Sequence, residues 1–113
     1  MKNWISYLNN LDDEKKAVVL EILNCAKKFS PNSVAEMPYG VPGLKLNGKP
    51  LIAVAAHKAH YGIYPFSPDV ITKTKKLIGE RETAKGTIRF RYGDIASENL
   101  IKQLVELRTK EII

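Results

Sequence analysis

The sequence predicts an α+β fold, a two-layer sandwich in which one antiparallel sheet has helices packed on one face. Amphipathic helical segments stand near both ends of the chain, alternating apolar segments with short turns lie between them, and residues 47–48 read Asn-Gly. Asn-Gly is a strong signal for a two-residue hairpin. Connections this short cannot carry a parallel crossover. The strands must therefore be antiparallel, and helices must cover the apolar face of their sheet.

Four helices are predicted from apolar spacing and from residues that cap helices. Asp12, Ser67 and Ser97 each precede a helical pattern, and their side chains can accept a hydrogen bond from the first turn. Ser30-Pro31 ends the longest apolar stripe, because proline disfavours helix at the residue before it. The helices are expected over residues 2–9, 13–29 and 68–78, and from residue 98 to near the end of the chain.

Five strands are predicted where apolar residues alternate between turn residues. The turn signals are residues 38–43, the Asn-Gly pair and the segment from His57 to His60. The strands are expected over residues 34–37, 44–46, 51–56, 61–64 and 87–91.

The length and composition indicate one globular domain over residues 1–113. The chain is 44% hydrophobic and 27% charged, which excludes a disordered or fibrous protein. No apolar run is long enough to span a bilayer, and the polar residues Asn9, Asn10, Asp12 and Asp13 argue against a signal peptide. Cys25 is the single cysteine and cannot form an internal disulfide. We therefore expect a cytoplasmic protein with no membrane partner.

The turn from His57 to His60 predicts which side chains share a face of the sheet. If it is a two-residue hairpin, the numbers of paired residues sum to 117, so His57 opposes His60. Side chains alternate between the two faces along each strand. The face under the helices is then bulky and apolar: Leu44, Leu46, Ile52, Val54, Tyr61, Ile63, Ile88 and Phe90. The open face carries Lys45, Ala53, Ala55, His57, His60, Gly62, Tyr64, Thr87, Arg89 and Arg91.

The open face is the candidate site, because the positive charge of the chain is concentrated near it. The whole chain has a net charge of +6, whereas residues 45–93 hold ten basic and three acidic residues, a net charge of +7. We expect small residues at the centre of the face to leave a shallow floor for an anion. The alternative is a solvated polar face without a ligand. The predicted anion-binding residues are Lys45, His60, Tyr64, Lys85, Arg89 and Arg91.

His57 and His60 are also a candidate metal pair, since opposed residues of a hairpin have Cβ atoms about 5 Å apart. Two imidazoles are only part of a coordination shell, and no cysteine or carboxylate is predicted beside them. Other chemistry has weaker support. Cys25 is expected to be an inert buried thiol, and no nucleophile–base pair can be named, so an enzyme is not expected. One well-placed aromatic among the cations is too few for a nucleic-acid partner.

Several motifs at consistent spacing resemble the YdhG-like family of small bacterial proteins, a domain of unknown function. They are Tyr39-Gly40-Val41-Pro42, the Lys-x-x-Gly-Lys-Pro-Leu segment from Lys45 to Leu51, the His-x-Gly-x-Tyr-Pro segment from His60 to Pro65, and the Lys-Gly-Thr-Ile-x-Phe segment from Lys85 to Phe90. The resemblance covers nearly the whole chain and implies the YdhG/YjbR/CyaY-like α+β architecture. Some relatives are described as frataxin-like iron chaperones, so the resemblance also implies a possible iron cargo.

Three hypotheses for function follow. The first is a non-enzymatic binding domain that presents the positive sheet face to an anionic small molecule or an acidic protein partner. The second is a frataxin-like intracellular iron chaperone that uses His57 and His60. Such chaperones rely on acidic surfaces, whereas the middle of this chain is positive. The third is a homodimer joined across the exposed sheet face. No resident cofactor is expected.

Overall fold

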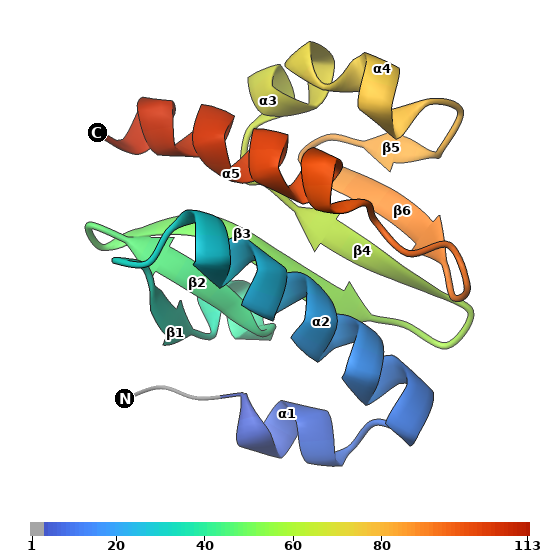
Figure 1. Cartoon of the computed structure of the whole chain (residues 1–113). Helices are drawn as coiled ribbons and strands as arrows, with labels where there is room; N and C mark the ends of the chain where they lie inside the picture. Colours follow the sequence, from blue (N-terminus) through green and yellow to red (C-terminus); the bar gives the residue numbers. More distant parts are fainter. Residues whose placement is uncertain (1–3) are drawn as a thin grey trace.

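The computed structural model describes residues 4–113, and runs of helices and runs of strands follow one another along the chain (Figure 1). Its elements are α1 (Ile5–Asn9), α2 (Asp13–Phe29), β1 (Val34–Glu36), a short 3-10 turn (Pro38–Gly40), β2 (Gly43–Leu46), β3 (Lys49–Ala56), β4 (His60–Tyr64), α3 (Pro68–Lys73), α4 (Lys75–Ile78), β5 (Thr83–Ala84), β6 (Thr87–Arg91) and α5 (Glu98–Ile112).

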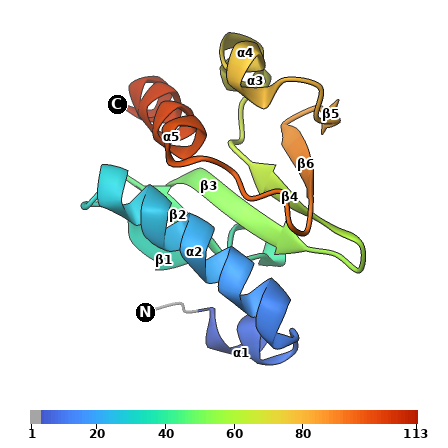
Figure 2. The same cartoon turned by 45° about the vertical axis from the view of Figure 1, so that its right-hand side comes forward.

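The strands form one six-stranded sheet in the order β1-β2-β3-β4-β6-β5, and every neighbouring pair is antiparallel. Helices α2 and α5 pack against each other and against β3 (Figures 1 and 2). They cover one face of the sheet, and α3 packs on α5. The predicted two-layer α+β fold is confirmed.

The three predicted caps determine where α2, α3 and α5 begin. The side chains of Asp12, Ser67 and Ser97 accept hydrogen bonds from backbone N–H groups three residues further on, at 2.9, 3.2 and 3.1 Å. Each bond satisfies one of the N–H groups that a helix leaves without a partner at its start. These helix starts could therefore be predicted from single residues.

Two elements differ from the prediction. The helix expected over residues 68–78 divides at Thr74, whose buried hydroxyl donates to the carbonyls of Val70 and Ile71 at 2.8 and 3.2 Å. Such bonds from threonine to the preceding turn bend helices. Strand β5 was not predicted, because two residues are too short to show an alternating pattern. The helix expected over residues 2–9 begins at Ile5, and residues 2 and 3 lie outside the described part of the chain.

The face of the sheet under α2 and α5 carries the predicted apolar side chains, each of them at most 9% exposed. Tyr61 lies flat against Phe90, with ring centroids 5.0 Å apart. Its hydroxyl donates to the carbonyl of Asp94 at 2.6 Å and accepts from the N–H of Ala96 at 3.2 Å. Burial raises the pKa of Tyr61 to about 12. The tyrosine thus fills the core and ties the segment after β6 to β4.

The other face of the sheet is partly covered by the turn at Pro38. A Cβ on Gly43 would lie 2.8 Å from Cγ of Pro38 and 2.6 Å from the carbonyl oxygen of Ile52. Only glycine leaves room for this close approach. The indole N–H of Trp4, at the start of α1, donates to the carbonyl of Gly43 at 3.1 Å. This bond attaches α1 to the same residue of β2.

We predict that Gly43→Ala lowers the free energy of unfolding by about 1–3 kcal/mol, because the added methyl group overpacks a site bounded by backbone. Urea unfolding measures the change. Gly62→Ala is the comparison, since its Cβ would meet only side-chain atoms of Thr87 and Tyr64 at 3.2–3.3 Å, which can move. Equal losses in the two variants would show that Pro38 does not require a glycine beneath it.

Candidate anion-binding site on the sheet

The β3–β4 hairpin has the predicted register. Ala53 pairs with Tyr64 and Ala55 with Gly62, and the N–H of His57 donates to the carbonyl of His60 at 2.8 Å. The two imidazole rings stack with centroids 4.7 Å apart. The hairpin therefore presents both histidines together at the end of the sheet.

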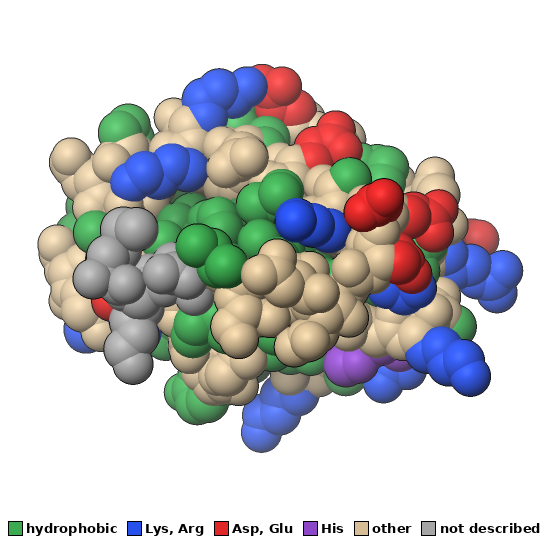
Figure 3. All heavy atoms as spheres, turned by 90° about the horizontal axis from the view of Figure 1, so that it is seen from below, with side chains coloured by type: hydrophobic (Ala, Val, Ile, Leu, Met, Phe, Trp, Pro, Cys, Tyr) green, Lys and Arg blue, Asp and Glu red, His purple; other side chains and the backbone are tan. Residues whose placement is uncertain are grey.

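Strand β6 adds cationic residues to this hairpin, because Gly62 pairs with Arg89 and His60 with Arg91. Gly62, between Ala55 and Arg89, is one of the residues that line a hollow of about 260 Å³, which we call the anion hollow. From below the molecule, a histidine side chain is visible at the surface with Lys and Arg side chains near it (Figure 3). The anion hollow is lined by His57, His60, Gly62, Tyr64, Ala84, Thr87 and Arg89.

The structure brings together only part of the predicted set. His60, Tyr64 and Arg89 line the anion hollow. Lys45 lies on β2, opposite Pro50, with β3 between it and β4. Lys85 lies in the turn between β5 and β6, outside the lining of the hollow. Arg91 lines a neighbouring hollow instead.

The floor of the hollow also differs from the prediction. Ala53 and Ala55 are buried, at 0% and 3% exposure, and neither lines the hollow. Gly62 does line it, and a Cβ on Gly62 would lie 3.3 Å from Cε1 of Tyr64. The tyrosine ring thus leans back along β4 over the glycine, an arrangement that shields a strand glycine. The hollow is narrower than an open sheet face would be.

Arg89 is held by an acid that the sequence analysis did not place. Its Nη1 lies 2.9 Å from Oε1 of Glu82, and its N–H donates to the carbonyl of Glu82 at 2.9 Å. Both side chains are at least half exposed, so the ion pair is screened by water. A two-residue turn at Lys85-Gly86 pairs residues whose numbers sum to 171, as Glu82 and Arg89 do. That turn was the signal that could have identified the pair.

The histidines lie in a positive and partly desolvated environment. The pKa of His57 is lowered, first by desolvation, then by the charges of His60 and Arg89. Arg89 and His60 both line the hollow with it. An anion placed there would relieve this repulsion, and would favour the charged imidazole.

The neighbouring hollow is larger, about 830 Å³, but its charges are mixed. Glu80, Glu82 and Asp94 line it together with three arginines. Arg81 contacts Asp94 through Nε at 2.7 Å and Nη2 at 2.9 Å, and its guanidinium lies over the ring of Phe90. The hydrogen bonds from Arg81 lower the pKa of Asp94. This pair joins two loops, and the carboxylates make the larger hollow less suited to an anion.

The histidine pair has no further candidate metal ligands beside it. Within residues 4–113, no three His, Cys, Asp or Glu side chains come together in a way that could hold a metal ion. Cys25 lies on α2 and is partly buried, and desolvation raises its pKa.

Comparison with known proteins identifies the fold. No family model and no curated protein matches the sequence. A crystal structure of YdhG from Bacillus subtilis, a protein of the DUF1801 family, is similar with a TM-score of 0.86 and 19% sequence identity. The match covers 96% of this chain and 89% of that chain. This chain has the YdhG fold. The resemblance predicted from the motifs is confirmed at the level of the fold.

In this YdhG-like fold the helices lie on the face opposite the anion hollow, so the candidate site is built by the sheet alone. No helix in the described residues is long and apolar enough to cross a membrane.

We predict that Glu82→Gln raises the affinity for sulfate roughly two- to fivefold, because the carboxylate competes with a bound anion for Arg89. Isothermal titration at low ionic strength measures the affinity. Glu98→Gln is the matched control, since it removes an exposed carboxylate that pairs with Lys28 at 3.0 Å on the helical side. The idea of competition fails if the two variants bind sulfate equally.

Proposed function

We propose that this domain binds a small anion in the anion hollow and does not catalyse a reaction. The observation that carries the proposal is that two histidines, an arginine, a tyrosine and a threonine line one hollow whose lining contains no carboxylate. Guanidinium, imidazolium and hydroxyl groups are the side-chain donors that recognise phosphate, sulfate and carboxylate oxygens.

The geometry favours a small anion over an acidic protein partner. The groups named above face one hollow of about 260 Å³ rather than being spread over the sheet. Gly62 lies beneath the Tyr64 ring and the methyl group of Thr87, so the anion is placed beside these side chains, against Arg89 and the histidine pair. Arg89 can turn from the exposed Glu82 to a ligand at little cost, because surface ion pairs of this kind are weak.

The iron-chaperone hypothesis has less support from the residues. His57 and His60 offer two nitrogen ligands, and a positive guanidinium shares their hollow. A cation placed there would be repelled by Arg89 and would need oxygen or sulfur ligands from elsewhere. We therefore propose the anion and not the metal as the ligand of this surface.

We predict that replacing Arg89 and Arg91 together by alanine lowers the affinity for sulfate and inorganic phosphate about tenfold or more, since charge-assisted hydrogen bonds are lost. Isothermal titration measures the affinity. Both arginines are exposed, so the free energy of unfolding should change by less than about 1 kcal/mol.

The control for this experiment is the double substitution Lys28→Ala and Lys73→Ala. It also removes two exposed cations, but on α2 and α3, away from the anion hollow. Sulfate binding that falls equally in both proteins would reflect net charge alone. Binding that survives the loss of Arg89 and Arg91 would place the anion elsewhere.

We also predict that sulfate binds more tightly as the pH falls from 8 to 5.5. The pKa of His57 lies below its usual value of 6.5 without a ligand, and a bound anion raises it, so binding takes up a proton. Sulfate keeps its charge over this range, which isolates the protein's contribution. His57→Gln should flatten the profile. A profile that is flat before the substitution would contradict the placement of the anion beside His57.

In the protein without a ligand, the lowered pKa of His57 makes folding less favourable as the pH falls, whereas sulfate binding becomes more favourable. Because the folded pKa of His57 is depressed, its contribution to stability is present above about pH 6.5 and is lost as the pH falls below that value.

A further inference from the structure

A second hollow adjoins the anion hollow and is lined only by aromatic and aliphatic side chains. It measures about 210 Å³ and is formed by Tyr39, Val41, Tyr64 and Phe66. The ring centroids are 5.7 Å apart for Tyr39 and Phe66 and 6.4 Å apart for Tyr64 and Phe66. Tyr39 is 86% exposed, so the rings form a surface feature rather than part of the core. We call this feature the aromatic cleft.

The two hollows meet at Tyr64, which lines both of them. Arg89 and the histidine pair line the anion hollow but not the aromatic cleft, whereas Tyr39, Val41 and Phe66 line the aromatic cleft but not the anion hollow. A ligand that fills both hollows must therefore extend past the side chain of Tyr64. A ring that carries its charge directly, such as benzoate, keeps the two groups in contact, whereas a ring joined to its phosphate through a linker can place one group in each hollow.

The backbone holds Tyr39 in a conformation that favours glycine. Its φ is 54° and its ψ is 28°, within the left-handed region that bulky residues rarely adopt. The turn is closed by a hydrogen bond from the N–H of Val41 to the carbonyl of Pro38 at 3.2 Å. Pro38 is itself packed against Gly43. The turn thus places an exposed ring at a position where folding alone would favour glycine.

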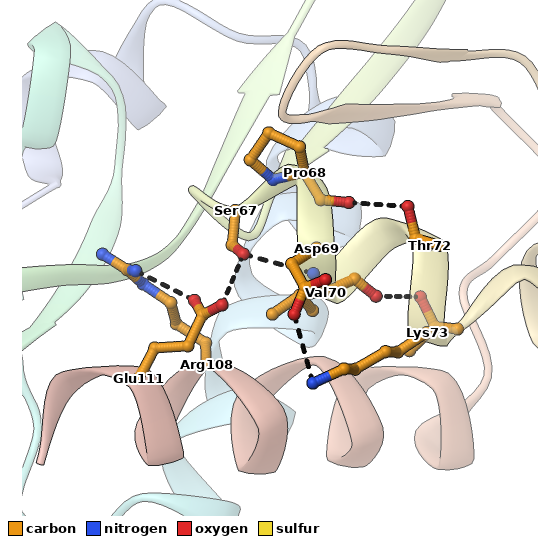
Figure 4. A network of polar contacts seen from close by, with 9 residues as sticks. Ser67, Pro68, Asp69, Val70, Thr72, Lys73, Arg108 and Glu111 are labelled. Atoms are coloured by element: carbon orange, nitrogen blue, oxygen red, sulfur yellow. Dashed lines mark hydrogen bonds and ion pairs between the residues drawn. The ribbon is translucent and has the colours of Figure 1, made fainter.

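Phe66 is the second bulky residue in the left-handed region, with φ of 60°. The chain directly after it is fixed by a polar network between α3 and α5 (Figure 4). Ser67 Oγ donates to Oε2 of Glu111 at 2.8 Å, and Oε1 of Glu111 lies 3.1 Å from Nη1 of Arg108. Strained positions of this kind persist when their surroundings hold them, and they occur often at ligand sites.

We propose that the ligand is an aromatic phosphate, a planar ring joined through a linker to a phosphate group, and that it occupies both hollows. This inference rests on the proposed anion site and names the class of its ligand. The ring lies in the aromatic cleft against Tyr39 and Phe66, where a planar π-system stacks favourably. The phosphate lies in the anion hollow, within reach of Arg89 and the histidine pair.

The test compares three probes by NMR titration at fixed pH and ionic strength: adenosine 5′-monophosphate, adenosine and inorganic phosphate. We expect adenosine 5′-monophosphate to bind about tenfold more tightly than inorganic phosphate, because one stacked ring adds to the anion contact. We expect adenosine alone to bind more weakly than the monophosphate. Backbone amides of both hollows should shift with the monophosphate, and those of the anion hollow alone with inorganic phosphate.

Tyr39→Gly is the decisive variant, because glycine adopts the left-handed turn without strain and the fold is retained. We expect it to reduce the affinity for adenosine 5′-monophosphate to that for inorganic phosphate, with the latter unchanged. Asn47→Gly is the matched control. Asn47 also has a positive φ, 52°, but it lies in the turn between β2 and β3, outside both hollows, and we expect no change in either affinity.

The outcomes separate this inference from the proposed function. The aromatic ligand is overturned, and the anion site kept, if inorganic phosphate binding depends on Arg89 but adenosine 5′-monophosphate binds no more tightly. The aromatic ligand is also overturned, and the anion site kept, if adenosine 5′-monophosphate still binds to the Tyr39→Gly variant more tightly than inorganic phosphate does. Both ideas are overturned if inorganic phosphate does not bind, or if its binding is unaffected by Arg89→Ala.

Discussion

The pairing of β3 with β4 through a two-residue turn is the constraint on which the rest of the molecule depends. Side chains alternate with a period of two, so a slip of one residue would move every side chain of a strand to the other face. The bond from the N–H of His57 to the carbonyl of His60 closes the hairpin. It directs Tyr61 into the core and leaves Gly62 on the other face, opposite Arg89. One register therefore determines both the core and the candidate site.

The helices cover one face of the sheet, whereas the opposite face is covered in parts by a turn and by single side chains. The turn at Pro38 packs on Gly43, and the ring of Tyr64 leans over Gly62. Ala53, which is fully buried, lies beneath this covering. The anion hollow and the aromatic cleft lie at the margins of these contacts. Their small volumes follow from how little of this face is left open.

Most of the fold could be predicted because its signals are local. Single capping residues marked the helix starts, and the β3–β4 turn gave the register of the central hairpin. The site could be predicted only where it lies on that hairpin and on β6. Lys45 shares the polar alternation of its strand, but it pairs with Pro50, at the end of β3 away from His57, and the register shift between Leu44 and Lys45 has no signal in residue spacing. The strand β5, and with it the contact of Glu82 with Arg89, was missed because two residues show no period.

The features that cost stability gather on the face of the sheet without helices. Tyr39 and Phe66 hold bulky side chains at positive φ, and His57 is desolvated beside two other basic groups. Under the helices, by contrast, Tyr61 has partners for its buried hydroxyl, and the caps of α2 and α5 are satisfied. Sequences agree with their fold at most positions and depart from it where function imposes another requirement. Asn47 shows the ordinary case, since an Asn-Gly turn adopts positive φ readily. Tyrosine and phenylalanine do not, so their presence at such positions calls for a role of the rings themselves.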